Sequence, residues 1–173
     1  MEELKNFIKS YFLPISLILI LSFSRLIPHP SNFTPILAVG VFSGFYFRNF
    51  LLAALIVIFS MFLGDLYLGF HDTMFFTYIS LAISVALGLL VKRLKFTEIL
   101  FSGLASSACF FAITNFGAWL TLAIYEKNFA GLLQSYVMAI PFFHNTLIST
   151  FLYLIVLKLI FDLAIKKTSN IST

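Results

Sequence analysis

The chain has 173 residues, of which 61% are hydrophobic and only 10% are charged, and its formal net charge is +4. Soluble domains carry about 25% charged residues, so this chain has too little polar material to cover a water-facing surface. The apolar excess runs along the whole length, which excludes a soluble domain with one anchor and indicates a polytopic helical membrane protein.

Apolar runs predict six transmembrane helices in a single domain, residues 1–173. A bilayer core of about 30 Å needs roughly 20 apolar residues per helix, so six spans use most of the chain. Prolines, glycines and short charged stretches mark the breaks between the runs. The break near Arg48 and Asn49 is short, so 33–68 is alternatively one bent hairpin with a tight turn. The expected spans are about 11–27, 33–48, 50–68, 73–91, 98–124 and 136–165.

The first run could be mistaken for a secretory signal peptide, because Lys5 and Lys9 precede its apolar segment. No small-residue cleavage site follows, however, and the chain instead continues into Arg25 and a group of prolines. We therefore interpret this run as the first transmembrane span.

Basic residues predict the orientation of the six helices. One face of the membrane would keep only Arg25 and Lys127, whereas the other would collect Lys5, Lys9, Arg48, Lys92, Arg93, Lys95, Lys166 and Lys167. Cytoplasmic loops carry the excess of lysine and arginine, so both termini are expected in the cytoplasm of a multi-pass protein of the inner (plasma) membrane. The net charge is then a topology signal and does not indicate binding to nucleic acid.

The remaining polar side chains gather at the external ends of these helices, and they supply the candidate substrate-binding residues. Intramembrane ionisable groups cost about 2.5–3.5 kcal/mol on insertion scales and usually pair or face a cavity. An Arg25–Asp65 pair would tie two helices together, or would form the polar floor of a binding site. The candidate contacts are Arg25, Asn32, Asp65, His71, Asn115, Trp119, His144 and Asn145.

Asn115 and Trp119 lie four residues apart and therefore share a helix face, where an amide and an indole could bond and stack a flat ring. The alternatives are an aromatic belt position for Trp119 and interhelical hydrogen bonds for Asn115 and Asn145. Pro141 precedes His144 near the expected start of the sixth helix, where unpaired N–H groups could meet an anionic group.

Metal binding and catalysis find little support. His29, His71 and His144 come from three different loops, and Asp65 and Asp72 would be needed to complete a divalent-ion site. No catalytic signature is present, and no glycine-rich phosphate loop, so any ATP must be bound by a partner. Cys109 would lie mid-helix as a small hydrophobe. We predict no catalytic residue, no metal and no cofactor.

Small residues at four-residue spacing predict close helix contacts in the inner half of the membrane. Gly40 and Gly44 form one such pair, and Gly103 with Ser107 and Ala105 with Cys109 form two more. Such pairs suit either a helix contact within the fold or a docking surface for a partner.

Several stretches carry a family resemblance: Ser31 to Gly44, Gly64 to Met74, Phe110 to Trp119 and Tyr136 to Thr146. They are similar to an uncharacterised family of six-helix membrane proteins, and the layout resembles the substrate-binding S components of energy-coupling factor (ECF) transporters. The resemblance implies an S-component-like bundle and a vitamin- or nucleobase-sized substrate captured on the outer face. It also implies a transmembrane coupling subunit and two ATPase subunits as partners.

One departure concerns docking to that module. S components typically carry an A-x-x-x-A motif on the first helix, and "PISLILILSFSRL" (14–26) contains no alanine. Either the Gly40–Gly44 pair docks the partner, or the chain does not use the shared module. A substrate-binding transport protein is therefore the expected function. The alternatives are a non-transporting membrane scaffold subunit and, last, an intramembrane enzyme using His and Asp residues.

Overall fold

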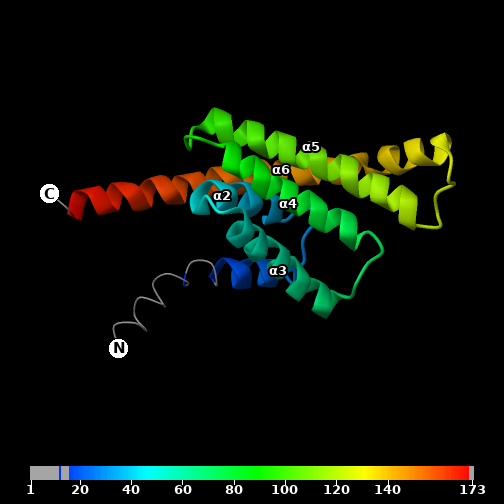
Figure 1. Ribbon diagram of the computed structural model, residues 1–173, viewed down its shortest axis with the longest axis horizontal. Helices are drawn as coiled ribbons and strands as arrows, with labels where there is room; N and C mark the ends of the chain where they lie inside the picture. Colours follow the sequence, from blue (N-terminus) through cyan, green and yellow to red (C-terminus); the bar gives the residue numbers. More distant parts are fainter. Residues whose placement is uncertain (1–11, 13–15, 172–173) are drawn as a thin grey trace.

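The computed structural model of the chain describes residues 12 and 16–171, with side chains up to residue 163, and it is all-α. The described part forms six helices (Figure 1). The first covers residues 16–24, and the others are α2 (Ile36–Phe47), α3 (Phe50–Leu68), α4 (Met74–Leu90), α5 (Phe96–Thr121) and α6 (Phe129–Ile171).

Local signals explain the helix boundaries. Two residues separate α2 from α3: Arg48 adopts a left-handed conformation (φ 51°), and the Asn49 side chain accepts a hydrogen bond from the N–H of Leu52. This N-cap satisfies one of the otherwise unpaired donors of α3. The two expected helices are thus joined by a very tight turn. Helices α3, α4 and α5 begin and end within three residues of the expected spans.

The expected start of the last helix is wrong. Helix α6 begins at Phe129 and not at residue 136, because Asn128 caps it by accepting a hydrogen bond from the N–H of Gly131 (2.9 Å). Pro141 lies inside this helix, so His144 and Asn145 are several turns past its start. The N–H groups expected there for an anionic ligand are therefore not those of a helix N-terminus.

Glycine brings α2 and α4 into close contact. A Cβ at Gly40 would overlap the Ser84 hydroxyl, one at Gly44 the Val85 carbonyl, and one at Gly88 the Val41 carbonyl. The Gly40–Gly44 pair is therefore buried between two helices of the same chain and does not form a docking surface. Around this contact packs a hydrophobic core made of Ile36, Leu37, Ala53, Val57, Leu81 and Val85.

Small residues also join α5 to α6. The Ser107 hydroxyl donates to the Thr150 hydroxyl (3.3 Å), and Gly103 faces the side chains of Leu154 and Thr150. Further along α5, Gly117 lies against the ring of Phe76 on α4. The expected Gly103–Ser107 spacing thus serves packing within the fold.

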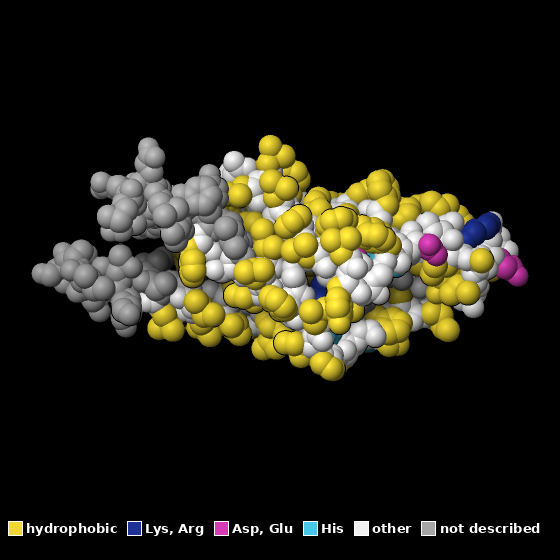
Figure 2. All heavy atoms as spheres, turned by 90° about the horizontal axis from the view of Figure 1, so that it is seen from below, with side chains coloured by type: hydrophobic (Ala, Val, Ile, Leu, Met, Phe, Trp, Pro, Cys, Tyr) yellow, Lys and Arg dark blue, Asp and Glu magenta, His cyan; other side chains and the backbone are white. Residues whose placement is uncertain are grey.

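In the part of the chain that the structure describes, three helices are long and apolar enough to cross a membrane: α3, α5 and α6. Helix α6 has 43 residues, or about 65 Å at 1.5 Å per residue. Helix α2 has 12 residues and so extends about 18 Å, well short of a bilayer core of about 30 Å. Figure 2 shows hydrophobic side chains spread over the face it presents, as expected of a membrane protein. Six full spans remain a prediction.

The loops between helices lie in two groups, one at each end of the bundle. In Figure 1 the α2–α3 turn, the α4–α5 loop and the C-terminal part of α6 lie toward the left, whereas the α3–α4 and α5–α6 loops lie toward the right. Residues 25–35 connect the first helix to the start of α2, so this loop and the α2–α3 turn lie at opposite ends of α2. We call residues 25–35 the proline loop, because it contains Pro28, Pro30 and Pro35.

Candidate ligand-binding cavity

The proline loop is an ordered turn fastened to α6. The N–H of Phe33 donates to the Pro30 carbonyl (2.9 Å), and Asn32 adopts a left-handed conformation (φ 62°), which asparagine tolerates well. The Asn145 amide donates to the Ser31 carbonyl (3.0 Å), and the Ser149 hydroxyl lies 3.4 Å from the Asn32 carbonyl. These two contacts join segments more than 100 residues apart in the chain.

Beneath this loop lies a cavity of about 190 Å³. The proline loop contributes one side of it, and α2, α3, α4, α5 and α6 each contribute at least one wall residue. Its wall is apolar toward α2, α3 and α5, and carries polar groups from the loop, α4 and α6. The lining residues are Arg25, His29, Asn32, Thr34, Ile36, Leu37, Met61, Leu68, Thr77, Leu81, Phe110, Thr146, Ser149 and Thr150.

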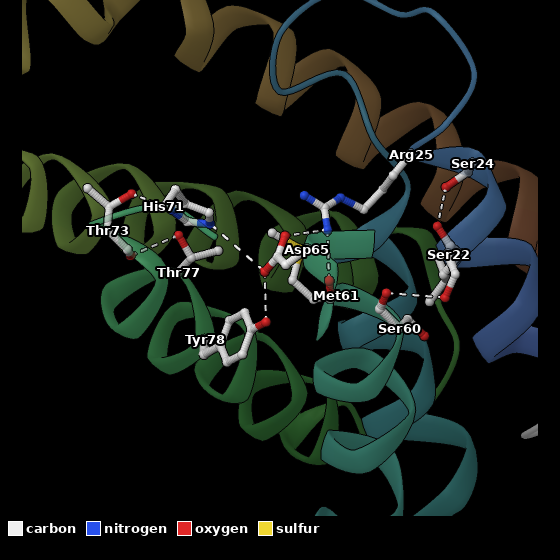
Figure 3. Close-up of polar contacts among 11 residues, drawn as sticks. Ser22, Ser24, Arg25, Ser60, Met61, Asp65, His71, Thr73, Thr77 and Tyr78 are labelled. Carbon is white, nitrogen blue, oxygen red and sulfur yellow. Dashed lines mark hydrogen bonds and ion pairs between the residues drawn. The ribbon is translucent and has the colours of Figure 1, made fainter. Parts of the chain in front are cut away.

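Arg25 and Asp65 form the most strongly charged contact at this cavity (Figure 3). Arg25 Nη1 lies 2.7 Å from Asp65 Oδ1 and also donates to the Met61 carbonyl (2.8 Å). The second Asp65 oxygen accepts a hydrogen bond from the Tyr78 hydroxyl (2.7 Å) and lies 4.0 Å from His71 Nε2. Asp65 is only 1% exposed, so its charge depends on these partners.

The position of this pair follows from the consecutive residues Gly64 and Asp65 in α3. A Cβ at Gly64 would overlap Arg25 Nη1 and would lie 3.1 Å from its Cδ, so only glycine leaves room for the arginine. The next residue, Asp65, faces inward and receives the guanidinium. The expected pair between the end of the first helix and α3 is therefore present, and its arginine lines the cavity. That the pair forms the polar floor of a binding site stays a prediction.

Hydroxyl groups supply the remaining polarity of the cavity. Thr77 donates to the Thr73 carbonyl (3.2 Å) and Thr146 to the Phe142 carbonyl (3.0 Å), each within its own helix. Thr150 accepts a hydrogen bond from Ser107 (3.3 Å). A hydroxyl that donates to its own helix keeps acceptor lone pairs, so these side chains can still receive hydrogen bonds from a ligand.

A smaller pocket of about 50 Å³ adjoins the main cavity and shares three of its residues, Asn32, Phe110 and Thr146. Asn115 lines this pocket, and its amide donates to the Phe111 carbonyl (2.7 Å) one turn earlier in α5. Within the described residues no donor contacts the amide oxygen of Asn115, which is therefore available as an acceptor.

The structure places the eight sequence-predicted residues in three groups. Arg25 and Asn32 line the main cavity, with Asn115 in the adjoining pocket. Asp65 and His71 lie behind Arg25, where Asp65 fixes the guanidinium. The other three line neither space: Trp119 donates to the Glu126 carbonyl, His144 contacts the Ile140 carbonyl, and Asn145 holds the proline loop.

Sequence reasoning missed Tyr78 and the hydroxyl groups of Thr77, Thr146, Ser149 and Thr150. Three of them stand at positions i, i+3 and i+4 of α6, a helical spacing that puts them on one face. That spacing was visible in "HNTLIST", but buried serines and threonines in membrane helices usually bond their own backbone, so it carries little information by itself.

Within the described residues, no group of three or more His, Cys, Asp or Glu side chains is placed to hold a metal ion. His71 Nδ1 is 2.9 Å from the Thr73 hydroxyl, and His29 Nδ1 contacts the Ile27 carbonyl (2.5 Å). The arrangement is chemically a polar-lined cavity with one fixed arginine, suited to binding a small polar molecule.

Comparison with known proteins identifies a family. A model described as "Family of unknown function (DUF6580)" matches residues 5–171, nearly the whole chain, so the chain belongs to this family. No curated protein and no solved structure matches it. The expected membership of an uncharacterised family is thus confirmed, whereas the resemblance to ECF S components remains a prediction.

Proposed function

We propose that this DUF6580 protein is a membrane transport protein that binds a small vitamin-like or nucleobase-like molecule on the outer face of the inner (plasma) membrane. The observation that carries the proposal is the cavity of about 190 Å³ beneath the proline loop. In an apolar bundle, a space walled by an arginine, an amide and several hydroxyls is costly unless something polar fills it.

The charge distribution supports the proposed orientation. Arg48 and the 92–95 stretch lie at the opposite end of α2 and α4 from the proline loop and the α3–α4 loop. If that basic end is cytoplasmic, the proline loop faces outward and both termini lie inside, as the positive-inside rule predicts. The substrate would enter past the proline loop and leave toward the cytoplasm.

Energy coupling would have to come from partner subunits. The chain carries no phosphate-binding loop, so ATP-driven transport needs a coupling subunit and two ATPase subunits, as in ECF transporters. Because Gly40 and Gly44 are buried against α4, such a subunit would dock on another surface.

A non-transporting scaffold is the second candidate. It is favoured by the hydrogen bonds of Asn115, Trp119 and Asn145, all of which go to backbone carbonyls. In that case the polar groups of the cavity stabilise the bundle, and no small molecule is bound.

Ligand screening separates the two candidates. Thermal unfolding of the purified protein in lipid nanodiscs is measured with a broad panel of vitamins, nucleobases and their precursors. Each compound is present at about a hundred times the weakest Kd that the screen is meant to detect. A true substrate then stabilises the fold by about 2.7 kcal/mol. A hit must lose its effect in Thr150→Val, which removes a cavity hydroxyl at nearly constant volume, and keep it in Thr121→Val, outside the cavity. A panel without any hit supports the scaffold.

A further inference from the structure

We infer that the cavity selects a neutral single-ring heterocycle that presents two adjacent hydrogen-bond acceptors to the guanidinium of Arg25. This inference rests on the proposed function and refines it by naming the substrate class. It follows from which edge of the guanidinium is free, from the charge of the site and from its size.

Asp65 and Met61 together leave one edge of the Arg25 guanidinium free. Arginine has five N–H donors, and the two on Nη1 go to the Met61 carbonyl and Asp65 Oδ1. Nη1 and Cδ both face Gly64, so the edge formed by Nε and Nη2 is the opposite one. Figure 3 shows these two nitrogens on the side away from Asp65, and within residues 16–163 neither has a hydrogen-bond partner.

This free edge is a fork with a defined ligand geometry. Its two N–H bonds are parallel and match two acceptor atoms side by side, either on a carboxylate or on a ring nitrogen next to a carbonyl oxygen. The Arg25 side chain is 15% exposed and lines the cavity. The contacts to Asp65 and Met61 hold the fork in one orientation, so little entropy is lost when a ligand binds.

The charge of the site favours the ring over the carboxylate. Asp65 already compensates Arg25 at 2.7 Å, and among the described residues that line the cavity there is no second arginine and no lysine. A carboxylate would therefore add an uncompensated negative charge within the bundle. By insertion scales that charge weakens binding roughly a hundredfold, whereas a neutral ring adds none.

The size of the site favours one ring over two. An engineered protein cavity of about 150 Å³ holds benzene, so about 190 Å³ suits a ring with one or two small substituents. The adjoining pocket of about 50 Å³ has room for one further substituent next to Asn115. Phe110 borders both spaces, so an aromatic ring is part of the wall that a flat ring would contact.

The experiment uses four probes on the full chain in nanodiscs, with binding measured by calorimetry. Cytosine has a ring nitrogen beside a carbonyl oxygen, and uracil places an N–H at that ring position. Orotate adds a carboxylate to a single ring, and guanine adds a second ring. We expect cytosine to bind at least tenfold more tightly than each of the other three.

One variant tests the fork directly. Arg25→Lys keeps a positive charge opposite Asp65 but removes the parallel donors, and we expect it to weaken cytosine binding at least tenfold. Arg48→Lys is the matched control, because Arg48 donates to the Leu89 carbonyl far from the cavity and should leave binding unchanged. If Arg25→Lys does not fold, the comparison of cytosine with uracil on the unaltered protein still tests whether the ligand needs two adjacent acceptors.

Two results would overturn the substrate class without touching the proposed function: orotate or guanine binding more tightly than cytosine, or cytosine and uracil binding equally. Failure of all four probes also rejects the class. The broad ligand screen described above then tests the proposed function separately. If a compound of another chemical class binds in that screen, the transport proposal stands although the substrate class is wrong.

Discussion

Replacing Asp65 by asparagine tests whether the buried ion pair stabilises the bundle. Asparagine keeps the shape of the side chain and one acceptor for Arg25, but it removes the charge that lies 2.7 Å from Nη1. Arg25 is then a positive charge in the interior of the bundle without a counterion. The Tyr78 hydroxyl, which donates to the other Asp65 oxygen, loses a charged acceptor in the same variant.

Two independent magnitudes agree on the size of the effect. Removing one partner of a buried pair costs 3–5 kcal/mol, and an uncompensated charge inside a membrane costs about 2.5–3.5 kcal/mol. Arg25 remains 15% exposed, which favours the lower part of the first range. We therefore expect Asp65→Asn to lower the free energy of unfolding by about 3 kcal/mol, or roughly 150-fold in the folding equilibrium.

The assay is equilibrium unfolding of the purified protein in mixed micelles, with two further variants. Removing both charges, in Arg25→Met with Asp65→Leu, should restore stability to within about 1 kcal/mol of the unaltered protein, since no charge is left unpaired. Asp162→Asn is the control: Asp162 pairs with Lys158 but is 49% exposed, so its loss should cost about 1 kcal/mol or less. An Asp65→Asn protein as stable as the Asp162→Asn control, or a double variant less stable than Asp65→Asn, would refute the reasoning.

Three further variants probe the packing and the proline loop. Gly88→Ala should destabilise the fold by about 1–3 kcal/mol, because its Cβ meets the rigid backbone of Val41, whereas the exposed Ala86→Leu should change thermal unfolding little. Asn145→Ala should speed amide hydrogen exchange in residues 26–34 by releasing the Ser31 carbonyl, and unchanged exchange there would contradict the fastening role. Asn49→Ala removes the N-cap of α3 and should cost about 1 kcal/mol in the same unfolding assay, while the exposed Thr97→Ala serves as its control.

Much of the helical layout could be predicted from the sequence, because length and hydropathy of a run are local properties. The prolines of 28–35, the Gly69–Asp72 stretch and the charges of 92–95 all lie in the connections between helices, as local breaker signals predict. The start of α6 was missed by seven residues, since Asn128 is a cap that resembles any polar loop residue. Pro141 was expected near the start of this helix, and it lies 12 residues past Phe129, the first residue of α6.

The candidate site was only partly predictable. Composition and topology placed Arg25, Asn32 and Asp65 at one end of the bundle, and the structure brings them to one cavity or directly behind it. The assignment of roles needed coordinates. Asn145 is 114 residues from Ser31 in the chain, and no local pattern reveals that its amide holds the proline loop.

By itself, the sequence determined that the chain is helical and apolar enough to cross a membrane, where most of its helices lie and which end is rich in polar side chains. Only the tertiary structure decided that Gly40, Gly44 and Gly88 join α2 to α4, that Gly64 makes room for Arg25, and that this arginine, bound through Nη1 to Asp65 and Met61, lines a cavity. The physical reason is the distance along the chain over which each effect acts. Hydropathy and helix caps act over a few neighbouring residues, whereas a cavity and the direction of a hydrogen-bond donor depend on side chains that meet only after the helices have packed.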